Sequence, residues 1–110
     1  MKVLRIGTLL NDVEVVDIKE QPLKTLQTMV DGYIEVCTPQ YWQGCYTEFL
    51  CNEEGRIKDM GINENFFPWY DLRGVVVVVG VNVDETDEFD SLTDNQIRCV
   101  KRWLKRLQFN

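Results

Sequence analysis

The stretch Arg73-Gly-Val-Val-Val-Val-Val-Gly80, which continues into Val81-Asn-Val83, decides the fold. Its five consecutive valines do not alternate with polar residues, so neither face of the segment is suited to water. β-Branched side chains favour extended backbone, and a glycine bounds the run at each end. A short, continuous apolar run of this kind is typical of a strand covered on both faces. The segment is therefore predicted to be the central strand of a small sheet.

Apolar periodicity and turn residues place the other elements around this strand. Strands are expected over residues 2–8, 13–18, 33–37 and 45–51, and a short strand or edge extension over 56–60. One amphipathic helix should begin at Pro22, which suits a first helical turn, and Gly32 should cap its C-terminus. The irregular, aromatic segment 61–72 is expected to pack over the sheet.

A second helix should follow Thr93, because Thr93 and Gln96 have the spacing of a capping box. Its expected apolar stripe, which should dock on the sheet, consists of Ile97, Val100, Trp103, Leu104 and Leu107. The chain is thus predicted to be α+β, a single domain over residues 1–110 with a mainly antiparallel sheet of four to six strands. One of its two helices should follow the second strand, and the other should be C-terminal.

Composition limits the classes of partner. The 110 residues are 45% hydrophobic and carry a formal net charge of −6, which disfavours nucleic acid because phosphate backbones are bound by Lys and Arg. The N-terminal residues lack a signal-peptide pattern, and no apolar run approaches the length of a membrane span. We therefore expect no membrane partner and a place in the cytoplasm.

The residue types also limit the chemistry. The chain has no histidine, which removes the commonest general base and metal ligand. Cys37, Cys45, Cys51 and Cys99 contain no Cys-x-x-Cys pair and are expected to be reduced thiols packed in the core. The acidic stretch 84–90 lacks the spacing of an EF-hand and is expected to be a solvated loop. Neither a metal nor another cofactor is predicted.

The C-terminal helix supplies the first candidate binding site. Five of the twelve basic residues lie between positions 98 and 106, namely Arg98, Lys101, Arg102, Lys105 and Arg106. Concentrated cations beside Trp103 could receive an anionic ligand or an acidic protein surface. Alternatively, they form an ordinary solvated face that complements the helix dipole.

A second candidate site lies in turns and loops. The turn from Asn52 to Gly55, in which Gly55 suits a positive φ, could bind through backbone and amide groups without net charge. Asn65 could contribute in the same way. Trp69, in the aromatic loop, could stack a base or anchor a partner.

Four segments together resemble a known family. They are Val30-Asp-Gly-Tyr-Ile-Glu35, Cys51-Asn-Glu-Glu-Gly55, Arg73-Gly-Val-Val-Val-Val-Val-Gly80 and Phe89-Asp-Ser-Leu-Thr-Asp-Asn-Gln-Ile97. The pattern is similar to that of the domain-of-unknown-function family numbered three-eight-four-six, through nearly the whole chain. That family occurs in phages, plasmids and Gram-positive bacteria and brings no established activity. Its loop after the fifth strand usually reads Pro-Pro-Asn-Arg, whereas residues 61–66 here keep Asn65 and lack the prolines and the arginine.

The resemblance and the absences lead to two functional hypotheses. In the first, this is a non-enzymatic protein of phage or mobile-element origin, working in the bacterial host cytoplasm. It would act stoichiometrically on a host protein, such as a defence protein, or sequester a small anionic signalling molecule. In the second, it is a carboxylate-dependent hydrolase or nucleotide-modifying enzyme. A homo-oligomer is compatible with both hypotheses.

Overall fold

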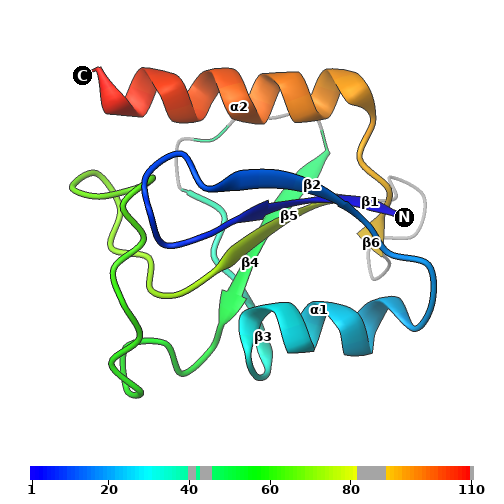
Figure 1. The fold of residues 1–110 in the computed structure, drawn as a ribbon, viewed down its shortest axis with the longest axis horizontal. Helices are drawn as coiled ribbons and strands as arrows, with labels where there is room; N and C mark the ends of the chain where they lie inside the picture. Colours follow the sequence, from blue (N-terminus) through cyan, green and yellow to red (C-terminus); the bar gives the residue numbers. More distant parts are fainter. Residues whose placement is uncertain (40–41, 43–45, 82–88, 110) are drawn as a thin grey trace.

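In the computed structural model, which describes residues 1–39, 42, 46–81 and 89–109, one sheet lies between two helices (Figure 1). The strands are β1 (Lys2–Ile6), β2 (Val13–Asp17), β3 (Ile34–Val36), β4 (Thr47–Asn52), β5 (Val76–Val81) and β6 (Phe89–Asp90), and the helices are α1 (Pro22–Val30) and α2 (Asp94–Gln108). The strand order is β2-β1-β5-β4-β3, with β6 paired to the end of β5, and every described pair is antiparallel. The predicted α+β class and the places of both helices are confirmed.

The valine strand is the centre of the sheet, as predicted. Val77 pairs with Arg5 of β1 on one side and with Leu50 of β4 on the other. The side chains of Val76 and Val78 join the core under α2, and those of Val77 and Val79 join the core under α1. All four are 0% exposed. The run lacks alternation because each face of β5 is covered by a helix.

Helix α2 docks through the expected apolar stripe. Its capping box is present: the Thr93 hydroxyl accepts a hydrogen bond from the Gln96 N–H at 3.2 Å, and the Gln96 side chain accepts one from the Thr93 N–H at 2.8 Å. Ile97, Val100 and Leu104 are buried against the sheet. The Trp103 ring packs among four aromatic rings at centroid distances of 5.1 to 6.2 Å, those of Trp42, Phe49, Phe66 and Tyr70.

Helix α1 differs from prediction in two details. Asp31, rather than Gly32, takes the left-handed cap conformation, at φ 61°, and the N–H groups of both residues close the last turn. Leu23, Leu26, Met29 and Val30 recur at helical spacing, which predicts one apolar face, but Leu23 is 59% exposed, whereas Leu26 and Val30 are buried. Among the described residues, neither helix has the length and apolar content that crossing a bilayer requires.

The segment between β4 and β5 corrects the sequence prediction most. Residues 56–60 form turns instead of a strand, because Lys58, Asp59 and Met60 donate their N–H groups to carbonyls three to five residues earlier. Within the described part of this segment, one isolated antiparallel β-bridge pairs Ile62 with Arg73. Gly55 does not have the positive φ that was expected. Its constraint is space, because a Cβ there would lie 3.2 Å from the Cβ of Arg73.

The acidic stretch 84–90 is described only at its end. Phe89 and Asp90, expected in a solvated loop, instead form β6 and pair with Val81 and Gly80. The other residues of the stretch, 84–88, lie outside the described part of the chain.

Candidate functional site

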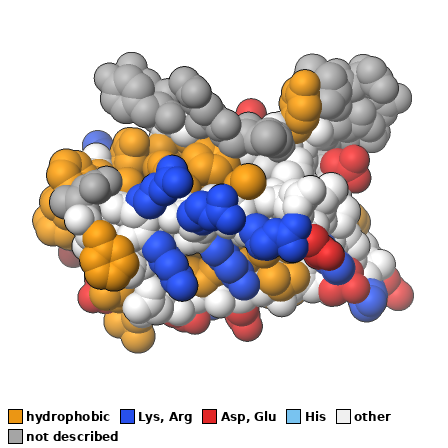
Figure 2. All heavy atoms as spheres, turned by 90° about the horizontal axis from the view of Figure 1, so that it is seen from above, with side chains coloured by type: hydrophobic (Ala, Val, Ile, Leu, Met, Phe, Trp, Pro, Cys, Tyr) orange, Lys and Arg blue, Asp and Glu red, His pale blue; other side chains and the backbone are white. Residues whose placement is uncertain are grey.

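The outward face of α2 carries a concentration of positive charge. Its five basic residues are all exposed, and Figure 2 shows lysine and arginine side chains gathered along this face: Arg98, Lys101, Arg102, Lys105 and Arg106. None of them forms an ion pair with another described residue, and the α2 ion pair that is described joins Asp94 to Lys2 at 3.7 Å. The exposed face expected from the sequence is therefore present.

The helix dipole explains only part of this charge. Cations stabilise the negative end of a helix within its last turn, where Lys105 and Arg106 lie. Arg98 is near the other end and donates a hydrogen bond to the Asn95 side chain. Lys101 is in the middle of the helix. Capping of the dipole thus does not account for the run as a whole.

A hollow of about 530 Å³ lies between the C-terminal half of α2 and the turn that joins β1 to β2. We call it the α2 hollow; it is lined by Asn11, Val13, Asn65, Lys101, Leu104, Lys105, Gln108 and Phe109. It brings together three residues that the sequence proposed separately, Lys101, Lys105 and Asn65. Its described lining contains two ammonium groups and no carboxylate.

Asn65 shapes this hollow rather than offering a free amide to it. The side chain is 2% exposed, and its Nδ2 donates to the carbonyls of Gly7 at 2.9 Å and Leu9 at 3.0 Å. Its Oδ1 accepts a hydrogen bond of 2.9 Å from the N–H of Asn11. These bonds occupy the amide and fix the β1–β2 turn. Asn65, proposed from the sequence as a binding residue, thus lines the hollow with an amide that is engaged by the β1–β2 turn.

Asn52 has a similar structural role at the other end of the sheet. It is 4% exposed, and its Nδ2 donates to the carbonyls of Val30 at 3.1 Å and Asp31 at 2.8 Å, which lie at the end of α1. Its Oδ1 accepts the N–H of Glu54 at 2.7 Å. The side chain therefore joins α1 to the turn after β4, and both N–H groups of its amide are used within the protein.

Trp69 lies beside the end of α2 and does not line the α2 hollow. Its ring is 50% exposed, and its indole N–H donates a 3.0 Å hydrogen bond to the Leu107 carbonyl. Neighbouring residues of the aromatic loop differ in burial: Phe66 is fully buried, whereas Phe67 is 55% exposed. Trp69 is thus close to the cationic helix and accessible to a partner.

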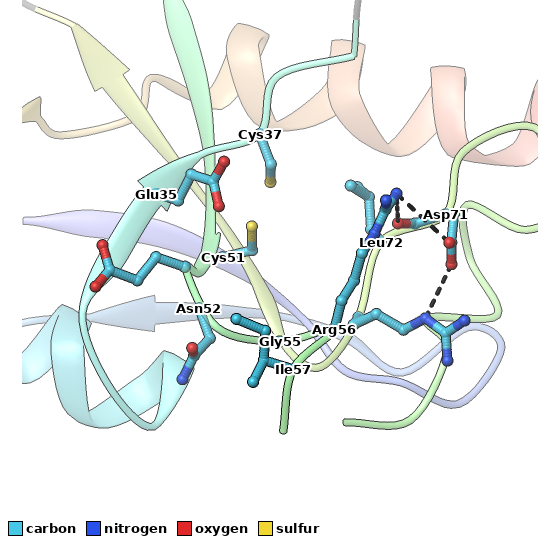
Figure 3. A pocket seen from close by; sticks show the side chains of 11 residues that line it. Glu35, Cys37, Cys51, Asn52, Gly55, Arg56, Ile57, Asp71 and Leu72 are labelled. Carbon is cyan, nitrogen blue, oxygen red and sulfur yellow. Dashed lines mark hydrogen bonds and ion pairs between the residues drawn. The ribbon is translucent and has the colours of Figure 1, made fainter. Parts of the chain in front are cut away.

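A second cavity, of about 480 Å³, includes Asn52 and Gly55 of the turn proposed from the sequence, but the rest of its wall was not predicted (Figure 3). We call it the motif pocket, because three of the four segments quoted for the family resemblance contribute to its wall. Its lining consists of Glu35, Cys37, Cys51, Asn52, Glu53, Gly55, Arg56, Ile57, Asp71, Leu72 and Arg73. The sequence contained a signal for this site, namely the segments that carried the resemblance, but not the contacts that bring them together.

One carboxylate holds the two arginines of the motif pocket. Asp71 accepts a hydrogen bond of 2.9 Å from Arg73 Nε, and its second oxygen lies 3.4 Å from Arg56 Nη2. Glu35 stands on the opposite side of the cavity, on β3 (Figure 3). The pocket therefore carries both acidic and basic side chains, whereas the charged side chains that line the α2 hollow are both lysines.

Core packing, predicted for all four cysteines, is confirmed for two of those described, because Cys51 belongs to the core under α2 and Cys37 packs against it. Cys51 is 7% exposed and Cys37 is half-buried, and their thiols point toward each other in the motif pocket (Figure 3). The hydrogen bond between them raises the pKa of Cys37 and lowers the pKa of Cys51. Cys99 is exposed on α2, so its predicted burial is wrong, and Cys45 lies outside the described residues. No cluster of three or more Cys, Asp or Glu side chains in the described ranges is placed to hold a metal ion.

Comparison with known proteins adds a family to this description. No curated protein matches the chain, and no solved structure matches it either. The model of one family, described as Domain of unknown function (DUF3846), matches residues 1–108. The match confirms the resemblance carried by the segments at residues 30–35, 51–55, 73–80 and 89–97. The chain belongs to the DUF3846 family.

Proposed function

We propose that this chain is a non-enzymatic binding protein that captures a small organic anion in the α2 hollow. The observation that carries the proposal is the pair Lys101 and Lys105, which flank a hollow whose described lining holds no carboxylate. Neither ammonium group forms an ion pair with a described residue. An anion bound there would meet two cations that need not first leave an ion pair with any described residue.

The spacing of the cations supports a ligand over a purely structural role. Lys101 and Lys105 are four residues apart on α2, as are Arg98 and Arg102, and Arg102 and Arg106. Like charges at this spacing destabilise a helix, typically by about 0.2–0.5 kcal/mol per pair. The face therefore costs folding free energy in the free protein, and a bound anion would relieve that repulsion.

The remaining lining indicates what else the ligand carries. Val13, Leu104 and Phe109 present apolar surface, and Asn11 and Gln108 present amides joined by a 2.8 Å hydrogen bond. A hollow of about 530 Å³ lies in the range of small-molecule sites, roughly 300–1,000 Å³. These features suit a molecule with an anionic group and an apolar or aromatic part, such as a nucleotide.

The proposal has a biological part, which rests on the occurrence of similar sequences in phages, plasmids and Gram-positive bacteria. We place the protein in a phage or other mobile element and its action in the cytoplasm of a bacterial host. By holding a small anionic signalling molecule, it would act as an inhibitor of a host defence response, in the manner of a counter-defence protein. A host protein bound by the same cationic face is the competing partner, and the test below separates the two.

The test is a binding assay with two matched charge reversals. The parent chain is titrated with nucleoside mono-, di- and triphosphates and cyclic dinucleotides, and binding is read by calorimetry and by the shift in Tm. The variant Lys101→Glu/Lys105→Glu changes the α2 hollow. The control Arg98→Glu/Arg102→Glu makes the same change in net charge on the same helix but outside the hollow.

We expect the hollow variant to lose at least about tenfold in affinity, which corresponds to about 1.4 kcal/mol, and the control to lose much less. The affinity of the parent should fall as ionic strength rises. Equal losses in both variants would assign binding to the whole cationic face, as expected for a protein partner. Unchanged affinity in both would move the site away from α2.

The enzymatic alternative has its own observation in the motif pocket, where Glu35 and Glu53 line one cavity with two thiols. Carboxylates at such a site could act as general acid and base. Incubating catalytic amounts of the protein with the same nucleotide panel tests this alternative. Turnover that is lost in Glu35→Gln would support an enzyme, whereas an unchanged panel supports stoichiometric binding.

A further inference from the structure

We propose that Cys37 and Cys51 form a redox-active dithiol that a hydroperoxide converts into an intramolecular disulfide across the motif pocket. The two thiols come from neighbouring segments of the sheet and point toward each other in the cavity (Figure 3). This pair is independent of the α2 hollow, with which it shares no lining residue.

The strand register brings the two cysteines together. Glu35 of β3 lies opposite Cys51 of β4, and Cys37 follows two residues later, so the side chains at 35, 37 and 51 share one face of the sheet. The N–H of Cys37 donates to the Phe49 carbonyl at 2.7 Å, which continues the pairing past the end of β3. Cys37 and Cys51 are therefore diagonal neighbours across two adjacent strands.

The two thiols have different roles: Cys51 reacts with the peroxide, and Cys37 then forms the disulfide with Cys51. The hydrogen bond from Cys37 favours the thiolate of Cys51, and the thiolate is the reactive form. The charge of Glu35 opposes a thiolate at either sulfur, and the two arginines of the pocket are paired with Asp71. The neighbouring Cys37 thiol is thus the group that lowers the pKa of Cys51.

The chemistry balances with one hydroperoxide as the oxidant. The Cys51 thiolate attacks one peroxide oxygen, the O–O bond breaks, and with one proton taken up Cys51 becomes a sulfenic acid while water or an alcohol leaves. The Cys37 sulfur then attacks the sulfenic sulfur, the S–O bond breaks, and the Cys37 proton leaves with the hydroxide as water. Two thiols are oxidised to one disulfide by two electrons, and the peroxide is reduced.

The disulfide would move the edge of the sheet. Diagonal neighbours in an antiparallel pair have Cα atoms roughly 7–8 Å apart, whereas disulfides usually need about 4.4–6.8 Å. The short strand β3 is at the sheet edge, paired among described strands only with β4, so its end could be drawn inward. Oxidation would thereby join β3 to β4 and remove both thiols from the pocket wall.

The first experiment uses the parent chain. The folded protein is treated with one equivalent of hydrogen peroxide, its free thiols are blocked with iodoacetamide, and it is digested after Glu and after aromatic residues. Cleavage after Trp42 and Glu48 places Cys37, Cys45 and Cys51 on separate peptides. The expected product is a linked pair of the Cys37 and Cys51 peptides that dithiothreitol separates. The proposal would be overturned if Cys37 and Cys51 were recovered alkylated or oxidised on separate peptides. It would also be overturned if either were linked to Cys45 or Cys99 instead.

A second experiment isolates the pair. The variant Cys45→Ser/Cys99→Ser keeps only Cys37 and Cys51, and one equivalent of phenylarsine oxide should block both thiols, because trivalent arsenic bridges two close sulfurs. Adding Cys37→Ser should abolish this stable adduct and stop peroxide oxidation at a single oxidised thiol. In the parent, Cys99 should remain alkylatable after the arsenical. Failure of the isolated pair to take up the arsenical would contradict the close approach of the two thiols.

Discussion

Gly32 lies so close to Asn52 that a Cβ on the glycine would be 2.6 Å from the amide nitrogen of the asparagine. Asn52 uses that nitrogen to bind the two carbonyls at the end of α1. The contact joins two segments of the family pattern, residues 30–35 and 51–55, which are separated by the 15 residues 36–50. A glycine is needed at position 32 for the close approach as well as for its φ of 155°.

Replacing Gly32 should therefore be costly. We expect Gly32→Ala to lower the free energy of unfolding by about 1–3 kcal/mol, because the methyl group displaces Asn52 and leaves the α1 carbonyls unpaired. Urea denaturation measures the change. Gly61→Ala is the control, since nothing lies within 4 Å of its Cβ position, and its effect should stay within about 0.5 kcal/mol. Equal effects of the two substitutions would show that the Asn52 contact contributes little.

Substitution of Val77 tests the two-sided burial of β5. An unpaired carboxylate at this fully buried position should cost several kcal/mol, comparable with a total stability of about 5–15 kcal/mol, so Val77→Asp should unfold the domain. Val15→Asp is the matched control, because Val15 is 43% exposed on β2 at the sheet edge. Circular dichroism and thermal melting distinguish them. A folded Val77→Asp variant with the parent's Tm would contradict the central position of the strand.

The amide of Asn65 provides a third test. Asn65→Ala should lower the free energy of unfolding by more than about 2 kcal/mol, because it leaves the buried Gly7 carbonyl and its neighbours in the β1–β2 turn without their partner. It should also weaken ligand binding in the α2 hollow, whose wall that turn forms. Asn95→Ala, on the exposed start of α2, should change stability by less than about 0.5 kcal/mol. Chemical denaturation of both variants, followed by the nucleotide titration, checks the two effects.

Acid should remove one small stabilising contribution at the N-terminus. Lys19 and the terminal ammonium group hold the pKa of Asp17 below its ordinary value of 3.8. A carboxyl whose pKa is depressed on folding stabilises the folded state above its unfolded pKa, and this contribution is lost as pH falls through the lower folded pKa. Asp17→Asn should therefore reduce the loss of stability below about pH 4. The effect is small because the group is exposed, and melting curves of both proteins at pH 2–7 measure it; identical pH profiles would contradict it.

Local sequence patterns were sufficient to predict the central strand and helix α2. The valine run predicted the central strand because a strand that is buried on both faces is apolar at consecutive positions. The stripe from Ile97 to Leu107 and the Thr93 cap predicted α2, since helical periodicity and capping are set by residues a few positions apart. The exposed cations of α2 followed from the same periodicity.

Features that depend on contacts between distant residues could not be predicted in this way. The pairing of Cys37 with Cys51 depends on the register of β3 against β4, and a shift of one residue would turn the two thiols to opposite faces. Asn52 and Asn65 were proposed as binding residues because they were expected in loops, where binding roles are common. In the structure, the side-chain amide of each donates its N–H groups to backbone carbonyls that are distant in the sequence. Strand β6 was missed because two residues carry no periodicity of their own.

The charge on α2 also makes the distribution of charge over the molecule uneven. The chain has 18 acidic and 12 basic residues and a formal net charge of −6, yet five of the cations project from one helix. Outside these five cations, the described residues carry 14 acids and seven cations, a charge of −7, so the described part of the molecule has a positive helix face and a negative remainder, and this separation gives it an electric dipole moment. In the field of an oppositely charged body the protein rotates before it makes contact. A cation-exchange resin should thus retard this acidic protein at neutral pH, helix first.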